Sequence, residues 1–137
     1  MPQFVFSTDL SRLDADWVHH TLAEHAYWAQ GRSREKQDAA NAASRCYAVH
    51  HVHTGAQVAF ARVVTDEATF AWLCDLIVDP AVRGNGVGKL LVDGVVEDLQ
   101  HLGLQRIVLS TGDAHALYAQ YGWEPLHNPE RWMERSS

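Results

Sequence analysis

The sequence predicts an α/β chain of the α+β kind, with a mixed central sheet in which an antiparallel meander is followed by a parallel β-α-β crossover. Three apolar, strand-like segments follow one another between residues 46 and 78, and the short turns between them are typical of antiparallel pairing. A glycine-rich loop and an amphipathic segment then separate the third strand from a fourth apolar segment. Such a strand–helix–strand unit forms a right-handed parallel crossover. The expected order is β-α-α-β-β-β-α-β-α-β.

The first 45 residues are expected to contain one strand and two helices. Residues 3–6 form a short apolar strand, and Asp14 or Asp16 can cap the helix that follows. Gly31 interrupts the helical pattern, and Ser33 begins a second, more polar helix that ends near residue 43. The first helix presents four residues on one side: Trp17, Val18, Leu22 and His25.

The meander consists of three expected strands at residues 46–52, 57–65 and 69–78. Turns at residues 53–55 and 66–67 connect them. Pro80 ends the third strand, because proline has no N–H to donate to a ladder.

The second half of the chain carries the strongest helical pattern. Gly103 is suited to end a helix over residues 87–102, and residues 105–109 then form a strand rich in branched side chains. Thr111 or Asp113 can cap a helix over residues 114–121, and a last strand or coil begins at Trp123. The apolar face of the long helix is formed by Val87, Leu90, Leu91, Val95, Leu99 and Leu102.

The composition favours one globular domain over residues 1–137. The chain is 47% hydrophobic and 20% charged, and its formal net charge of −6 argues against a nucleic-acid partner. Cys46 and Cys74 do not form a disulfide framework, which indicates a reducing compartment, and we expect a cytoplasmic protein. No signal peptide is recognised at the start, and no window approaches the ~20 apolar residues of a membrane span.

The loop between the third strand and the long helix is the most informative segment. Its glycines leave the backbone bare at the start of a helix, where free N–H groups and the helix dipole favour an anion such as phosphate. A P-loop needs Ser or Thr after its lysine, but Leu90 stands there. A dinucleotide-binding fingerprint needs a third glycine where the chain has lysine. The loop is formed by Arg83, Gly84, Asn85, Gly86, Val87, Gly88 and Lys89.

Two motifs together resemble the signatures of the GCN5-related N-acetyltransferase (GNAT) superfamily. Val78-Asp79-Pro80 followed by Arg83-x-x-Gly86-x-Gly88 is similar to its acetyl-CoA signature. Residues 116–123 resemble its second signature, with Trp123 where the family usually has Phe. The resemblance implies a GNAT fold in which the loop N–H groups, from Gly84 to Lys89, accept the pyrophosphate of acetyl-CoA. It also implies that the pantetheine arm pairs with the backbone of Leu76, Ile77 and Val78.

The resemblance also implies a catalytic tyrosine. Tyr118 matches the family position near the coenzyme sulfur, where it would act as general acid or as a donor to the thiolate; packing in the core is the alternative, and Tyr121 is the fallback. Asp75 lies inside an apolar strand, where burial would raise its pKa toward the range of a general base for the amine. A hydrogen-bonded structural role for Asp75 is an equal alternative, and Glu24 is a second candidate base.

Other reactive residues receive weaker roles. The nine histidines show no familiar zinc spacing, so we expect no metal. Cys74 has no neighbouring histidine to activate it, which disfavours a covalent acetyl-enzyme. Tyr27 and Trp28 are candidate walls for an amine, whereas Trp17 is expected in the core.

The expected function is transfer of an acetyl group from acetyl-CoA to a small-molecule primary amine, directly within a ternary complex. A non-catalytic sensor of acyl-CoA and an acetyltransferase acting on proteins or peptides are the alternatives. A homodimer is compatible with such a fold, but the sequence carries no specific signal for one.

Overall fold

A computed structural model describes residues 3–136 and centres on one five-stranded sheet. The strand order along the sheet follows the sequence: β1 (Phe4–Ser7), β2 (Arg45–His51), β3 (Gln57–Thr65), β4 (Phe70–Val78) and β5 (Arg106–Leu109). The pairs β1/β2, β2/β3 and β3/β4 are antiparallel, and β5 is parallel to β4. The expected meander and crossover are therefore confirmed.

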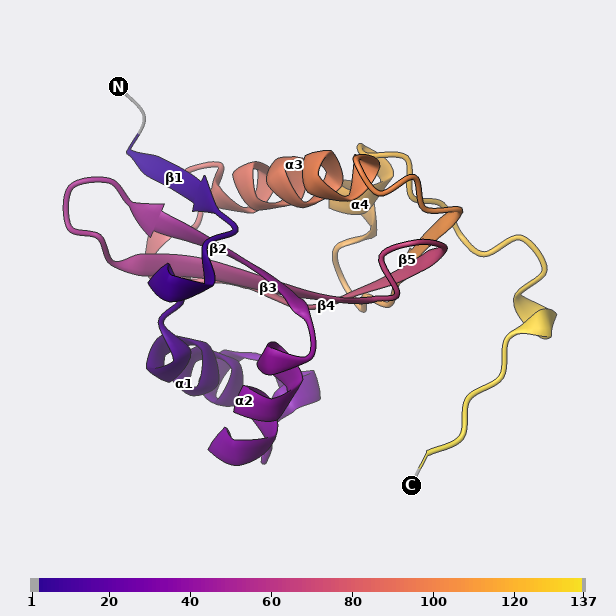
Figure 1. The fold of residues 1–137 in the computed structure, drawn as a ribbon, viewed down its shortest axis with the longest axis horizontal. Coiled ribbons are helices and arrows are strands. Elements are labelled where there is room, and N and C mark those ends of the chain that lie inside the picture. Colours follow the sequence, from indigo (N-terminus) through magenta and orange to yellow (C-terminus); the bar gives the residue numbers. More distant parts are fainter. Residues whose placement is uncertain (1–2, 137) are drawn as a thin grey trace.

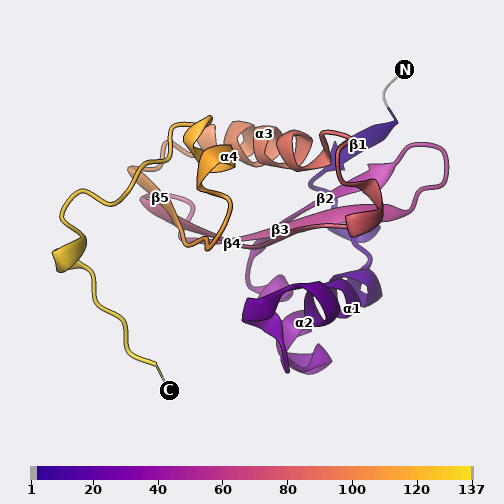
Figure 2. The ribbon, with the colours of Figure 1, turned by 180° about the vertical axis from the view of Figure 1, so that it is seen from behind.

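Helices cover both faces of this sheet. Helices α1 (Ala15–His25) and α2 (Arg34–Ala42) lie on one face, and α3 (Val87–Gln100) and α4 (His115–Ala119) lie on the other (Figure 1, Figure 2). Asp14 caps α1 by accepting from the N–H of Trp17 at 3.0 Å, and Ser33 caps α2 in the same way. Among residues 3–136, no helix combines the length and the apolar character needed to cross a membrane.

The larger core lies between α3 and the sheet. The apolar face of α3 buries Val87, Leu91, Val92, Val95 and Leu99 against residues of β2, β3 and β4. A smaller core under α1 contains Val18, Leu22, Phe60 and Ile77. Trp17 packs against this second core, as expected from its position on α1.

The chain differs from expectation after α4. Residues 110–136 contain no strand, so the last strand of the expected order is wrong; its only regular elements are α4 and a 3-10 turn, Pro129–Arg131. Pro125 and Pro129 have no N–H for a ladder, and most side chains of this segment are exposed. Trp123 contacts β5 through its side chain instead, because its Nε1 donates to the carbonyl of Ile107 at 3.0 Å.

Strand β4 bends halfway along its length. Its pairing with β3 changes register between the pairs Arg62–Cys74 and Phe60–Ile77, which forms a β-bulge. Asp75 lies in this bulge and has a φ of 53°. Strand β5 pairs only with Phe70–Leu73 of β4, so the second half of β4 lies beyond the partner strand. A left-handed non-glycine residue costs about 1–3 kcal/mol, and such conformations cluster at functional sites.

Candidate active site

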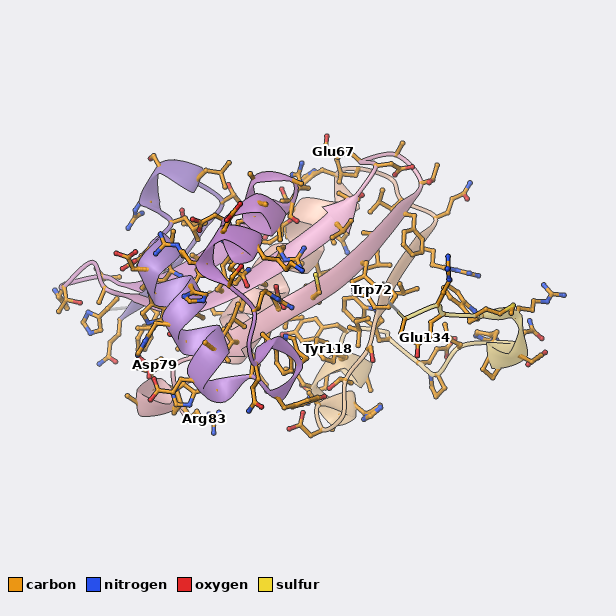
Figure 3. All side chains as sticks on the ribbon, turned by 90° about the horizontal axis from the view of Figure 1, so that it is seen from below. Glu67, Trp72, Asp79, Arg83, Tyr118 and Glu134 are labelled. Carbon is orange, nitrogen blue, oxygen red and sulfur yellow. The ribbon has the colours of Figure 1, made fainter. Side chains whose placement is uncertain are left out.

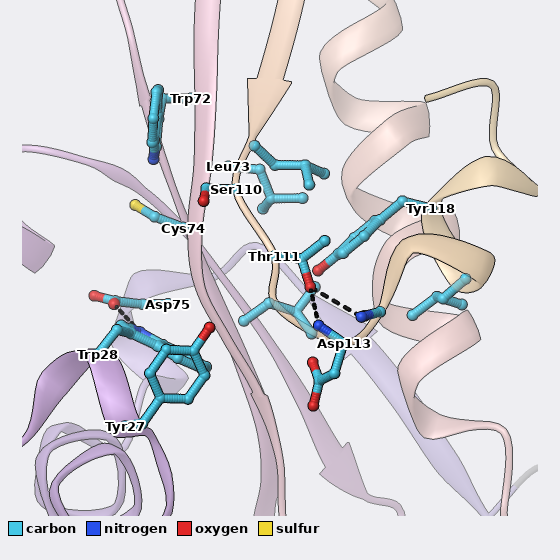
Figure 4. A pocket seen from close by; sticks show the side chains of 14 residues that line it. Tyr27, Trp28, Trp72, Leu73, Cys74, Asp75, Ser110, Thr111, Asp113 and Tyr118 are labelled. Carbon is cyan, nitrogen blue, oxygen red and sulfur yellow. Dashed lines mark hydrogen bonds between the residues drawn. The ribbon is translucent and has the colours of Figure 1, made fainter. Parts of the chain in front are cut away.

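A pocket of about 340 Å³ lies where β4 and β5 separate. Its walls come from the segment between α1 and α2, the middle of β4, the end of β5 and its following loop, and α4 (Figure 4). The pocket brings together Asp75 and Tyr118, the two residues expected to act in catalysis. Figure 3 shows the same region from below, with Tyr118 and Trp72 labelled in the middle of the molecule and Asp79 and Arg83 at the turn after β4.

The carboxylate of Asp75 is enclosed by hydrogen-bond donors. Its side chain is 1% exposed, and Oδ1 accepts from Nε1 of Trp28 at 2.9 Å. Oδ2 accepts from a guanidinium nitrogen of Arg32 at 2.7 Å and from Nε of Arg62 at 2.9 Å. The amide of Gln37 lies 3.5 Å from the same oxygen. Both carboxylate oxygens are thus engaged by fixed partners.

The expected rise in the pKa of Asp75 is wrong. Burial by itself would raise the pKa, but the charge and hydrogen bond of Arg62, the bond from Trp28 and the charge of Arg32 together lower it below the ordinary value. A carboxylate with a lowered pKa is a weak base. The environment of Asp75 therefore favours the alternative of a hydrogen-bonded structural role.

Tyr118 enters the pocket from α4 and is 7% exposed. Its ring meets Trp123 edge-on, with ring centroids 5.7 Å apart, which fixes the direction of the side chain. Burial, followed by the negative charge of Asp113, raises the pKa of Tyr118 to about 12. The phenol is consequently neutral at physiological pH and able to donate a proton or a hydrogen bond.

The glycine loop leads from a 3-10 turn at Pro80–Val82 into α3. Gly84 and Gly86 have φ values of 87° and 75°, and a side chain at either position would meet no protein atom within 4 Å. Gly86 is the N-cap of α3, whose first hydrogen bond runs from the N–H of Leu90 to the carbonyl of Gly86. Open space therefore lies in front of the first turn, as an anion seat requires.

The remaining loop residues divide between packing and solvent. Val87 is buried in the core, and Arg83 and Lys89 are exposed cations. Asn85 donates from its side-chain amide to the carbonyl of Val82 at 2.9 Å and so braces the loop. Tyr121 donates to the carbonyl of Lys89 at 3.3 Å, which ties the end of α4 to the first turn of α3.

The backbone residues expected to meet the pantetheine arm lie in the second half of β4. Leu76 lines the pocket, whereas the side chain of Ile77 is buried in the smaller core and that of Val78 packs against the larger one. All three follow the bulge, in the part of β4 that extends beyond its pairing with β5.

Several weaker candidates are now placed. Glu24 lies on α1 beside His20 at 2.9 Å and is absent from the pocket lining, so the structure does not bring it to the site. Cys74 lines the pocket, but burial raises the pKa of its thiol, which opposes a thiolate nucleophile. Tyr27 and Trp28 both line the pocket. Among residues 3–136, no group of three or more His, Cys, Asp or Glu side chains is arranged to hold a metal ion.

Sequence reasoning missed the partners of Asp75 and one further carboxylate of the pocket. Arg62 lies in an apolar strand, where a charged residue needs a partner of opposite charge. Its position therefore indicates an acidic partner on the neighbouring strand. Arg32 and Gln37 gave no such signal, because they lie in polar segments 43 and 38 residues from Asp75. Asp113, a candidate helix cap by its position in the sequence, lines the pocket.

Comparison with known proteins agrees with this geometry. Residues 9–123 match the model of the acetyltransferase (GNAT) family. The GCN5-related N-acetyltransferase 1 of Arabidopsis thaliana, a chloroplastic protein, is 38% identical over 61 residues, which are 44% of this chain and only 31% of that protein. The chain thus spans less than a third of this relative.

Solved structures cover much more of the chain. A Xanthomonas campestris protein assigned to the GNAT family is 42% identical and superposes with a TM-score of 0.92 over 100% of this chain and 95% of that one. Rv2747 from Mycobacterium tuberculosis, solved in complex with coenzyme A, is 19% identical with a TM-score of 0.72 over 90% and 76% of the two chains, and shows the shared fold. With its bulged β4, its glycine loop and a family match over residues 9–123, the chain belongs to the GNAT family of acetyltransferases.

Proposed function

We propose that the protein is an N-acetyltransferase that moves an acetyl group from acetyl-CoA directly to a primary amine within a ternary complex. One observation carries the proposal: Tyr118 and the bulged half of β4 border the same pocket. Tyr121, which follows Tyr118 in the same segment, donates to the carbonyl of Lys89 in the glycine loop. The segment that carries Tyr118 therefore contacts the loop on which the donor would be seated.

The donor side fits acetyl-CoA, the co-substrate of this family. Its thioester supplies an activated acetyl group. The N–H groups from Gly84 to Lys89 would hold the pyrophosphate, and the bare glycines allow its oxygens to approach the backbone. Arg83 and Lys89 add positive charge at this end. The backbone of Leu76, Ile77 and Val78 would pair with the pantetheine arm in the manner of an added strand.

The acceptor side is aromatic. Tyr27 and Trp28 are 65% and 45% exposed, and their rings meet edge-on with centroids 5.0 Å apart. Together with Trp72 they form one wall of the pocket. Exposed aromatic side chains that converge on a cavity are typical of a small-molecule site. This wall favours a small amine over an open groove for a peptide.

The transfer needs one nucleophile and one proton donor. The neutral amine nitrogen uses its lone pair to form a bond to the acetyl carbon, and backbone N–H groups of the second half of β4 stabilise the negative charge on the carbonyl oxygen. The carbon–sulfur bond then breaks, and the sulfur keeps the electron pair. Tyr118 donates its proton to the sulfur, and solvent takes the extra proton from the amine and returns one to Tyr118.

Asp75 has a positioning role in this scheme. Its oxygens are occupied by Trp28, Arg32 and Arg62, so an amine cannot reach a free lone pair without displacing a partner. The same bonds hold the indole of Trp28 against the pocket. We assign Asp75 to fixing the acceptor wall.

A turnover screen tests the function. The purified protein is given acetyl-CoA with separate panels of polyamines, amino acids, aminoglycosides, aryl-alkyl amines and peptides, and release of free thiol is followed. Turnover with small primary amines is the expected result. Binding of coenzyme A without turnover of any panel would support a sensor module, and turnover of peptides alone would support a protein acetyltransferase. Failure to bind acetyl-CoA would overturn the proposal.

A further inference from the structure

The pocket has an unbalanced charge. Its lining contains two carboxylates, Asp75 and Asp113, and no lysine, arginine or histidine within the described residues. The charge of Asp75 is already neutralised by Arg32 and Arg62. Asp113, in contrast, forms no ion pair with any side chain of residues 3–136. Asp113 is therefore the pocket carboxylate whose charge no side chain of the described residues balances.

The loop that carries Asp113 is held in place from two sides. Oγ1 of Thr111 accepts from the N–H groups of Asp113 and Ala114 at 3.3 Å and 3.0 Å (Figure 4). On the other side, a Cβ at Gly112 would stand only 2.9 Å from Oη of Tyr27. The glycine therefore allows Tyr27 to close against the residue next to Asp113. Asp113 is also close enough to Tyr118 that its charge, after burial, helps to raise the pKa of the phenol.

The aromatic wall completes a site for a cation. An ammonium group is attracted by the face of an aromatic ring within about 6 Å, most strongly by tryptophan. Trp28 is a preorganised wall, because its Nε1 is bound to the buried Asp75. The two guanidinium groups behind Asp75 repel a cation from that side of the pocket and leave Asp113 as its partner.

We infer that Asp113 binds the ammonium group of the acceptor, and that the acceptor is a cationic amine with a flat apolar flank that lies against Tyr27 and Trp28. This inference rests on the proposed acetyltransferase function and names the substrate class of the same pocket. Asp113 acts as a binding residue: it holds the amine in its charged form until the proton leaves to solvent, beside the tyrosine that serves the leaving sulfur. An amine whose carbon next to nitrogen carries a carboxylate is disfavoured, because two negative groups would meet.

Equilibrium binding tests the ammonium seat without relying on turnover. The probes are 2-phenylethylamine and its neutral analogue 2-phenylethanol, titrated into the full chain with and without coenzyme A while tryptophan fluorescence is recorded. The wild type should bind the ammonium probe about tenfold more tightly than the alcohol. Asp113→Asn should abolish this preference, and Asp113→Lys should reverse it. Glu97→Gln removes one exposed charge from α3 and should leave the preference unchanged.

The outcomes separate the two proposals. A wild type that binds both probes equally or neither, or an Asp113→Asn variant that keeps the full preference, would overturn the ammonium seat. Loss of preference in Glu97→Gln as well would also overturn it, since the effect would then be one of net charge. Absence of coenzyme A binding, with the ammonium preference intact, would count against the acetyltransferase function alone.

Discussion

Nε1 of Trp28 donates a 2.9 Å hydrogen bond to Oδ1 of Asp75, and this bond joins a half-exposed indole to a buried carboxylate 47 residues away in the sequence. It links the helical layer to the bulge of β4. Because Arg32 and Arg62 hold the other oxygen, the indole is anchored to a charged cluster inside the protein. The position of Trp28 in the acceptor wall therefore depends on the ion pairs that Asp75 forms with Arg32 and Arg62.

Removing the charge of Asp75 should destabilise the fold. Asp75→Asn keeps the size of the side chain, and asparagine tolerates the positive φ, but two partly buried guanidinium groups lose their buried counter-charge. Breaking a buried pair from one side costs about 3 kcal/mol. Urea unfolding at pH 7 should show this loss, whereas Glu97→Gln should unfold like the wild type.

Asp75→Asn should also change how the free energy of unfolding depends on pH. The pKa of Asp75 is lowered in the folded state, so its contribution is complete above the unfolded pKa of about 3.9 and is lost as pH falls through the lower folded value. The difference in free energy of unfolding between wild type and Asp75→Asn should therefore become smaller below pH about 4. Other carboxylates with a lowered pKa, such as Asp66, act equally in both proteins. An unchanged difference down to pH about 2 would contradict the assignment.

A glycine in α3 should resist substitution for a different reason. A Cβ at Gly94 would stand 2.5 Å from ring atoms Cδ1 and Cζ of Phe6, whose ring is stacked on Tyr47 with centroids 5.8 Å apart. Gly94→Ala should destabilise the protein by about 1–3 kcal/mol despite the better helix propensity of alanine. The midpoint of thermal unfolding measures the effect.

A second glycine of the same helix provides the control. A Cβ at Gly88 would meet only Cγ2 of Val78, at 3.9 Å, so Gly88→Ala should unfold at or above the wild-type temperature. Replacing Phe6 with alanine should relieve the clash, so that the double variant loses less than the sum of the single changes. Strict additivity would show that Phe6 is not the obstacle.

The sequence was sufficient for most of the fold and for placing the glycine loop before α3 and Tyr118 on α4. An apolar segment between two turns located β3 at residues 57–65, and helical periodicity located the start of α3 at Val87. Fixed local motifs located the glycine loop and Tyr118. The bulge at Asp75 and the cluster around it could not be predicted in the same way, since they depend on side chains from four separate segments. The expected last strand failed because side-chain packing of Trp123, and not a backbone ladder, attaches the chain to β5.

The role of the glycine loop can be tested with two variants that introduce similar backbone strain, only one of which lies in the loop. Gly86 and Gly103 stand at opposite ends of α3, with φ values of 75° and 66°, and a side chain at either would meet nothing within 4 Å. Both Gly86→Asp and Gly103→Asp should lose roughly 1 kcal/mol of stability from the left-handed conformation. Only Gly86→Asp should weaken acetyl-CoA binding, by about a hundredfold, because a carboxylate would occupy the seat of the pyrophosphate. Calorimetric titration measures both variants, and equal affinities would remove the loop from the donor site.

Two tyrosines near the end of the chain give the sharpest test of the chemistry. Tyr118→Phe should lower kcat about a hundredfold and leave KM for acetyl-CoA nearly unchanged, because the hydroxyl is needed when the sulfur leaves. Tyr121→Phe is the matched control: it removes a hydroxyl that donates to the carbonyl of Lys89, and it should keep kcat. Since the pKa of Tyr118 is raised to about 12, its ionisation should cause no fall in wild-type activity up to pH about 10. If Tyr121→Phe lost activity while Tyr118→Phe kept it, the proton donor would be Tyr121.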